Sequence, residues 1–61
     1  MKLTDYEKEL IDSTFDTFEN KSTEFILQVA TNGVSDSLGI KHDDALDLIM
    51  DYLYEQSKAK Q

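Results

Sequence analysis

The chain has 61 residues, enough for a single domain, and it contains no cysteine and no proline. A chain of this size buries only about 60% of the surface that its unfolded form exposes, so without disulfides it depends on good helix packing or self-association. Its 13 acidic and 6 basic residues give a formal net charge of -7, and all six basic residues are lysine. This balance argues against a phosphate-binding surface and against adhesion to an anionic membrane, because both require positive charge. A basic protein partner fits the charge better.

The first predicted helix covers about residues 4–20. Thr4 and Glu7 have the spacing of a capping box, in which two side chains satisfy backbone N–H groups at the start of a helix. Apolar residues at helical spacing define one face: Leu3, Tyr6, Leu10, Ile11, Phe15 and Phe18. Acidic residues define the opposite face: Asp5, Glu9, Asp12, Asp16 and Glu19. The pattern is that of an amphipathic helix with an acidic outer side.

The second predicted helix covers about residues 23–38 and is apolar over more than half of its circumference, which is typical of a buried helix. Ser22 or Thr23 can cap its start, and Gly39 is suited to end it. Gly33 leaves two interpretations open, because a glycine inside a helix costs about 1 kcal/mol but is tolerated. We favour a continuous helix, with a break at Gly33 followed by a short extra turn as the alternative.

The third predicted helix covers about residues 43–58. Its apolar face consists of Ala45, Leu46, Leu48, Ile49, Tyr52 and Leu53. A second acidic row, Asp43, Asp47, Asp51 and Glu55, faces away from it, with Asp44 alongside. Met50 lies on the rim of the apolar face, and Tyr54 projects into the middle of the acidic arc. Like charges at this spacing oppose one another by about 0.2–0.5 kcal/mol per pair, which invites a functional explanation.

Together the three helices predict an all-α fold, a small three-helix bundle in a single domain covering residues 1–61, because short connections place successive helices beside one another. The apolar faces are wider than a minimal core requires, so part of them is predicted to meet a partner or a second copy. The longest apolar run, residues 25–27, is far too short to span a bilayer, and the first residues lack the apolar stretch of a secretory signal. We therefore expect a cytoplasmic protein, and we expect the chain to be a complete short open reading frame rather than a fragment.

Enzymatic activity is not expected. The single histidine, His42, lies at a predicted helix start, where capping or exposure to solvent is its ordinary role, and nothing indicates a serine nucleophile with an oriented base. A partial oxygen-rich metal site could include His42, Asp43, Asp44 and Asp47, but no calcium-binding loop motif is present. We expect solvated acids at a helix start, with no metal and no cofactor.

Residues 34–48 resemble the spacing of a helix-turn-helix motif, with a turn at residues 38–40 and a buried side formed by Ala45 and Leu48. The resemblance covers about a quarter of the chain. Aspartates occupy the positions that would contact bases and phosphates: Asp43, Asp44, Asp47 and Asp51. Because aspartates repel phosphates, we interpret this stretch as a helix–glycine–helix corner and expect no direct binding of nucleic acid.

The acidic rows have three interpretations: a solvated face that keeps the bundle soluble, a docking surface for a protein, or mimicry of nucleic acid toward a basic groove. The predicted partner-binding residues are Asp43, Asp47, Met50, Asp51, Tyr54 and Glu55, with the acids of the first helix as a secondary surface. The sequence therefore predicts a small non-enzymatic interaction module or regulator, similar in style to accessory proteins of bacteria and phages. The alternative is a structural protein that forms a homo-oligomer through its surplus apolar face.

Overall fold

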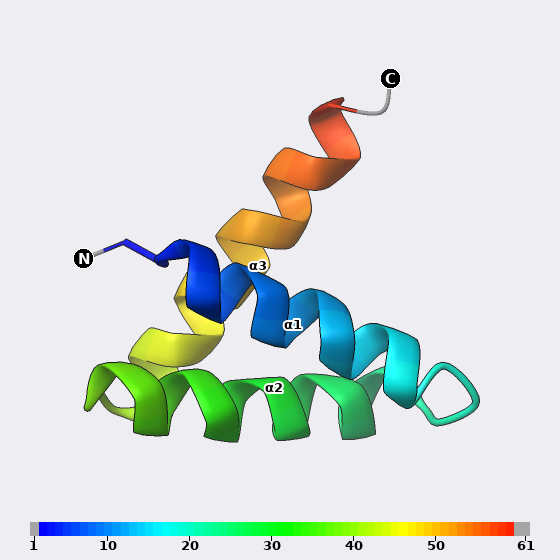
Figure 1. Ribbon diagram of the computed structural model, residues 1–61, viewed down its shortest axis with the longest axis horizontal. Coiled ribbons are helices and arrows are strands. Elements are labelled where there is room, and N and C mark those ends of the chain that lie inside the picture. Colours follow the sequence, from blue (N-terminus) through cyan, green and yellow to red (C-terminus); the bar gives the residue numbers. More distant parts are fainter. Residues whose placement is uncertain (1, 60–61) are drawn as a thin grey trace.

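The computed structural model describes residues 2–59 and contains three helices in that range: α1 (Asp5–Thr17), α2 (Thr23–Leu38) and α3 (His42–Ala59). Helices α1 and α2 lie side by side, and α3 crosses them at a steep angle (Figure 1). The second half of α3 extends past the other two helices toward the C-terminus. Helix α2 contacts both of its neighbours. The predicted all-α three-helix bundle is confirmed.

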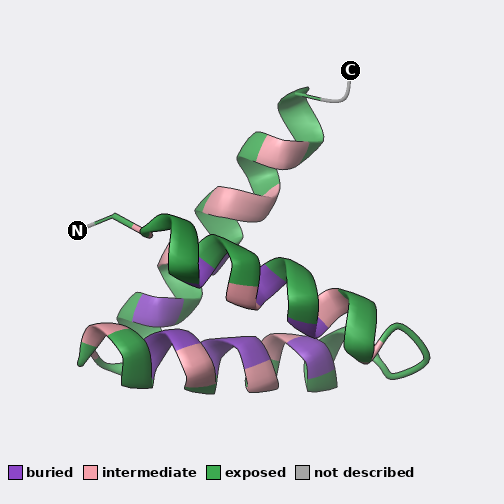
Figure 2. Cartoon of the chain, viewed as in Figure 1, coloured by how far each residue is buried: buried purple, intermediate pink, exposed green. Residues whose placement is uncertain are grey.

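The core lies where the three helices meet. It consists of Ile11 from α1, Ala30 and Val34 from α2, and Ala45 and Ile49 from α3, all of which are completely buried. Figure 2 shows that buried positions gather on the sides of the helices that face one another. Burying one side chain of the size of Ile11, Val34 or Ile49 stabilises the fold by about 1.5–3 kcal/mol, so these three residues provide a large share of the stability.

Helix α2 continues through Gly33, as the favoured interpretation predicted, and a break at this glycine is excluded. The reason for a glycine here is the close approach of α1. A Cβ atom at position 33 would lie 2.8 Å from Cδ2 of Leu10, whereas ordinary van der Waals contact begins at 3.4 Å. Glycine thus allows the Leu10 side chain to rest directly on the backbone of α2.

The ends of α2 follow the predicted capping pattern. The Ser22 hydroxyl accepts the backbone N–H of Phe25 at 3.2 Å, which satisfies one of the unpaired donors at the start of the helix. At the other end Gly39 has a φ of 65°, the left-handed conformation that favours glycine. The next residue, Ile40, donates its N–H to the Ser35 carbonyl oxygen at 3.1 Å and packs against the core. These contacts fix the corner between α2 and α3.

The first helix ends earlier than predicted: α1 stops at Thr17 rather than at about residue 20. Phe18 leaves the helical conformation, with φ -110° and ψ 30°, and its carbonyl oxygen accepts the N–H of Lys21 in a tight turn. In this conformation the Phe18 ring meets the Phe25 ring edge to face, with 5.4 Å between centroids. The aromatic contact and the turn give the chain an alternative to another helical turn, which periodicity alone did not reveal.

A buried carboxylate joins the start of α1 to the end of α2. Glu7 is only 3% exposed, and it accepts hydrogen bonds from the Thr4 backbone N–H at 2.8 Å, from the Thr4 hydroxyl and from the Ser37 hydroxyl. The Ser37 hydroxyl, followed by that of Thr4, lowers the pKa of Glu7 below its usual value of 4.5 because these hydrogen bonds favour the ionised form. The predicted capping-box pair is present, and its carboxylate also holds two helices together.

Candidate partner-binding surface on the third helix

The six predicted partner-binding residues, Asp43, Asp47, Met50, Asp51, Tyr54 and Glu55, are all exposed on α3. Because each residue advances about 100° around a helix, they cover a continuous arc of about 140°. The structure therefore brings them together on one side of the helix. Their surroundings differ, however. Asp51 and Glu55 face the N-terminal segment of the chain, whereas the other four residues lie on the outer side of α3.

The outer part of α3 carries a row of large apolar side chains that remain partly exposed. Leu46, Met50 and Tyr54 are 38%, 50% and 62% exposed, and each lies four residues after the one before. We call these three residues the apolar stripe. At 1.5 Å per residue the stripe extends about 12 Å along the helix, or a little over two turns.

Acidic side chains accompany the apolar stripe. Asp43 and Asp47 are exposed on the adjoining side of α3, and Lys58 is the only lysine in this helix. The Nζ atom of Lys58 lies 5.6 Å from the centroid of the Tyr54 ring, within the range of an attraction between a cation and an aromatic face. One end of the stripe is thus an aromatic ring that already accommodates a cation.

A groove between α2 and α3 borders the stripe at Leu46. It has a volume of about 500 Å³ and is lined by Glu24, Leu27, Gln28, Thr31, Asn32, His42 and Leu46. Leu27 and Leu46 are its large apolar lining residues, and Glu24 is its acidic one. Because Leu46 belongs both to the groove and to the stripe, the two features form one continuous surface, called here the α2–α3 surface.

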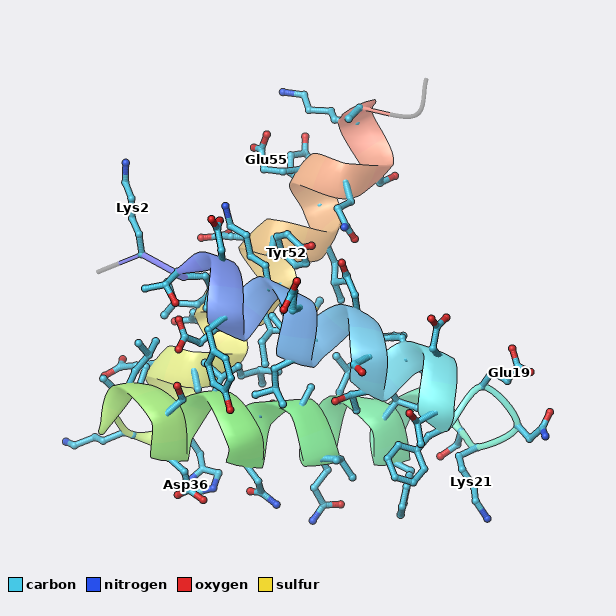
Figure 3. The ribbon with its side chains drawn as sticks, viewed as in Figure 1. Lys2, Glu19, Lys21, Asp36, Tyr52 and Glu55 are labelled. Carbon is cyan, nitrogen blue, oxygen red and sulfur yellow. The ribbon has the colours of Figure 1, made fainter. Side chains whose placement is uncertain are left out.

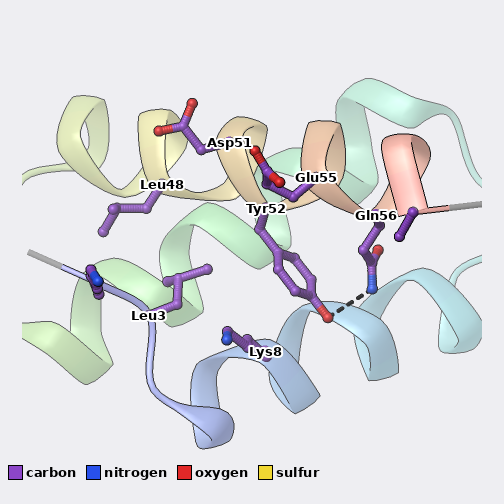
Figure 4. Close-up of a pocket in the computed structure, with 9 residues that line it drawn as sticks. Leu3, Lys8, Leu48, Asp51, Tyr52, Glu55 and Gln56 are labelled. Atoms are coloured by element: carbon purple, nitrogen blue, oxygen red, sulfur yellow. Dashed lines mark hydrogen bonds between the residues drawn. The ribbon is translucent and has the colours of Figure 1, made fainter.

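Asp51 and Glu55 belong to a second, larger groove of about 800 Å³ between α3 and the beginning of the chain. Its lining includes two lysines, Lys2 and Lys8, and Figure 4 shows Lys8 on α1 across the groove from the two acids on α3. Leu3, Leu48 and Tyr52 provide apolar lining. Lysines from elsewhere in the chain therefore share this groove with Asp51 and Glu55, a proximity that the spacing along α3 could not indicate.

Tyr52 ties the projecting half of α3 to α1. Its hydroxyl donates to both carboxylate oxygens of Asp12 at 3.1 Å and accepts a hydrogen bond from Nε2 of Gln56 at 2.8 Å. Figure 3 shows the Tyr52 ring between the two helices. Burial of the hydroxyl, together with the Asp12 carboxylate, raises the pKa of Tyr52 above its usual value of 10.0.

The predicted secondary acidic surface is exposed on α1 and the turn after it: Asp5, Glu9, Asp12, Asp16 and Glu19. Asp12 takes part in the bonds to Tyr52 and Gln56, so it contributes to the packing of α3. Tyr6 was predicted on the apolar face of this helix, but it is 63% exposed. The buried side of α1 is defined by Glu7, Ile11 and Thr14, whose centre lies about 100° around the helix from Tyr6, so the Tyr6 ring lies beyond its edge.

The single histidine makes a structural contact. Nε2 of His42 lies 2.7 Å from Oδ1 of Asn32, which joins the start of α3 to α2. Within residues 2–59, no group of three or more histidine, cysteine or acidic side chains is arranged to hold a metal ion. Over the same part of the chain, no helix combines the length and the apolar character needed to cross a membrane.

Leu46 was predicted to lie on the buried apolar face of its helix, and Glu24 and Leu27 were not predicted as site residues. A signal for Leu46 was present, because the spacing Leu46–Met50–Tyr54 places it on one line with the two residues that were recognised as exposed. No sequence signal indicated that Glu24 and Leu27 of α2 line this groove, because their position beside α3 depends on how the two helices cross.

Comparison of the chain with protein-family models, with curated protein sequences and with solved structures finds no match.

Proposed function

We propose that this chain is a non-enzymatic protein-binding module that docks a basic partner protein through the outer face of α3. The observation that supports the proposal is the apolar stripe of Leu46, Met50 and Tyr54, exposed on consecutive turns beside Asp43 and Asp47. Single exposed apolar residues are ordinary on protein surfaces, whereas a contiguous row rimmed by polar residues is typical of interaction sites. The acids then determine which partners are attracted.

The charge favours a basic partner over the alternative of a homo-oligomer. Two copies that met through this face would each bring Asp43 and Asp47 to the interface, and the whole chain has a net charge of -7. Like charges brought together at an interface are unfavourable, while a partner with lysines or arginines gains attraction at the same positions. The same acids disfavour nucleic acid, whose phosphates carry the same sign.

Affinity capture from host extract, followed by binding measurements with each purified candidate, tests this proposal. Two matched pairs of variants separate a specific surface from general charge. Asp47→Lys changes the α3 surface and Glu9→Lys makes the same change on α1. Tyr54→Ala and Tyr6→Ala remove rings that are 62% and 63% exposed.

The proposal predicts that a genuine partner binds about tenfold more weakly to each α3 variant and within about twofold of wild type to each α1 variant. Raising the salt concentration should weaken the wild-type interaction, because the attraction between exposed charges is screened. Equal weakening by Asp47→Lys and Glu9→Lys, with no effect of Tyr54→Ala, would leave only long-range charge and would refute a docking surface on α3. A dimer in sedimentation that Met50→Ser converts to monomer would favour the homo-oligomer instead.

A further inference from the structure

We infer that the partner presents an amphipathic basic helix, which occupies the groove between α2 and α3 and continues along the apolar stripe. This inference rests on the proposed function and specifies the chemistry of its occupant. It depends on the form of the α2–α3 surface, which is elongated, apolar along its middle and acidic at its edges.

The groove can receive an apolar anchor. It is an open groove with a volume of about 500 Å³, and Leu27 and Leu46 line it from two different helices. Beyond Leu46 the stripe continues through Met50 and Tyr54 for about 12 Å. A second helix offers apolar residues at three- and four-residue spacing over the same length, so two to three turns of it match this surface.

Polar side chains line the groove beside its apolar residues. Thr31 lines the groove and is only 7% exposed, and its hydroxyl has no hydrogen-bond partner within residues 2–59. An unpaired buried hydroxyl is unfavourable. The amides of Gln28 and Asn32 line the same groove, so a polar side chain of the occupant, placed next to its apolar anchor, would find partners there.

Acidic residues beside the apolar part of the α2–α3 surface favour an occupant with positive charge. Glu24 of α2 lines the groove on one side, while Asp43 and Asp47 of α3 are exposed on the other. A helix with an apolar row between two basic edges places cations near both sets of carboxylates. A second copy of this chain would place carboxylates there instead, because the surface that it offers is itself acidic.

The Tyr54 ring favours arginine at one end of the site. Lys58 lies over this ring at 5.6 Å, so its face accepts a cation in the unbound protein. Arginine stacks on aromatic faces and also pairs with a carboxylate through two parallel hydrogen bonds, which lysine cannot do. An arginine of the occupant can therefore displace Lys58 from the ring.

A synthetic peptide tests the inference directly. The probe is a fluorescein-labelled peptide of 18 leucine, lysine and arginine residues, with leucines at positions i, i+3, i+4 and i+7. The control peptide has the same composition, but its leucines are distributed around the helix. We expect fluorescence anisotropy to show at least tenfold tighter binding of the segregated peptide to the wild-type protein. We also expect its circular dichroism to gain helical signal on binding.

Variants locate the binding surface. Leu46→Ser, Met50→Ser and Asp47→Lys should each weaken binding of the segregated peptide about tenfold, whereas Tyr6→Ala and Glu9→Lys should change it less than twofold. Met50 is 50% exposed, so Met50→Ser keeps the test valid should Leu46→Ser reduce stability. Urea unfolding of each variant establishes that the protein is folded under the binding conditions.

Equal affinity for the two peptides, or equal weakening by Asp47→Lys and Glu9→Lys, would overturn the inference, because attraction of charge alone would explain the binding. The proposed function would survive that result if captured partners still distinguished the α3 variants from the α1 variants. Failure of both experiments would refute both proposals. Self-association that Leu46→Ser abolishes would identify a second copy as the occupant and would also overturn the inference.

Discussion

Replacing Gly33 with alanine should destabilise this protein, although the same change stabilises an ordinary helix. Alanine is favoured over glycine in a helix interior by about 1 kcal/mol. At position 33, however, the new Cβ would lie 2.8 Å from Cδ2 and 3.5 Å from Cγ of Leu10, a side chain that packs against the core. Forcing an extra methyl group into a packed contact costs about 1–3 kcal/mol. The two effects together predict that Gly33→Ala lowers the free energy of unfolding by about 1 kcal/mol.

Shortening Leu10 should reverse the sign of this effect. In a Leu10→Ala background the methyl group at position 33 meets no leucine, so Gly33→Ala should raise the free energy of unfolding by up to about 1 kcal/mol. The coupling between the two substitutions is then about 2 kcal/mol, well above the usual additivity error of about 0.3–0.5 kcal/mol. Urea unfolding followed by circular dichroism measures all four proteins of this cycle.

The total stability permits the measurement. At about 0.05–0.15 kcal/mol per residue, the free energy of unfolding of a 61-residue chain is about 3–9 kcal/mol, which exceeds the loss of about 1 kcal/mol expected for Gly33→Ala. If Gly33→Ala stabilised the protein equally in both backgrounds, the close approach of Leu10 to α2 would not explain the glycine. The contact between Leu10 and position 33 would then not determine how closely α1 and α2 pack.

Three further predictions follow from single side chains. Ile49→Ala should lower the free energy of unfolding by about 2–5 kcal/mol, measured by urea unfolding, because Ile49 is completely buried; a loss below 1 kcal/mol would contradict its place in the core. The lowered pKa of Glu7 means that its contribution to stability is present above pH 4.5 and is lost as the pH falls through its folded-state pKa. Stability measured from neutral pH downward should therefore fall more steeply in wild type than in Glu7→Gln, and parallel curves would refute the role of this carboxylate. The raised pKa of Tyr52 means that one of the three tyrosines should ionise later than the others in an absorbance titration, and that stability should be lost as the pH rises through this pKa. Tyr52→Phe should remove the late phase, and its persistence would assign it to another ring.

The helices were predictable because local signals and the apolar pattern agree over most of the chain. The second helix has the predicted bounds, residues 23–38, because Ser22 and Gly39 mark its two ends by their own chemistry. The first helix lacks such a stop signal, and the turn at Phe18 depends on contact with Phe25 across the loop. An end that is determined by a tertiary contact does not appear in the periodicity of the helix itself.

The candidate site was predictable on α3 but not across helices. Exposure of Met50 and Tyr54 follows from their positions around α3, and both were recognised. The grouping of Asp51 and Glu55 with Lys8 depends on how α3 crosses α1, and the periodicity of α3 alone does not specify that crossing. The burial of Glu7 was hidden for a similar reason, because its partner Ser37 is 30 residues away along the chain.

The residues of α3 that stabilise the fold and those proposed to bind a partner lie on different sides of the helix. Ala45 and Ile49 point into the core, whereas Leu46 and Met50, one residue further along, lie about 100° around the helix and are exposed. Substitutions on the outer face should therefore change binding with little loss of stability, a requirement for every variant pair used above. In the projecting half of α3, Tyr52 and Gln56 bond to Asp12 of α1, and Leu53 is only half-buried, so this half is less firmly anchored than the half that contains Ile49. A partner helix that covers Met50 and Tyr54 would bury apolar surface on this half and should stabilise it, which hydrogen exchange of the backbone amides of α3 can detect as slower exchange on binding.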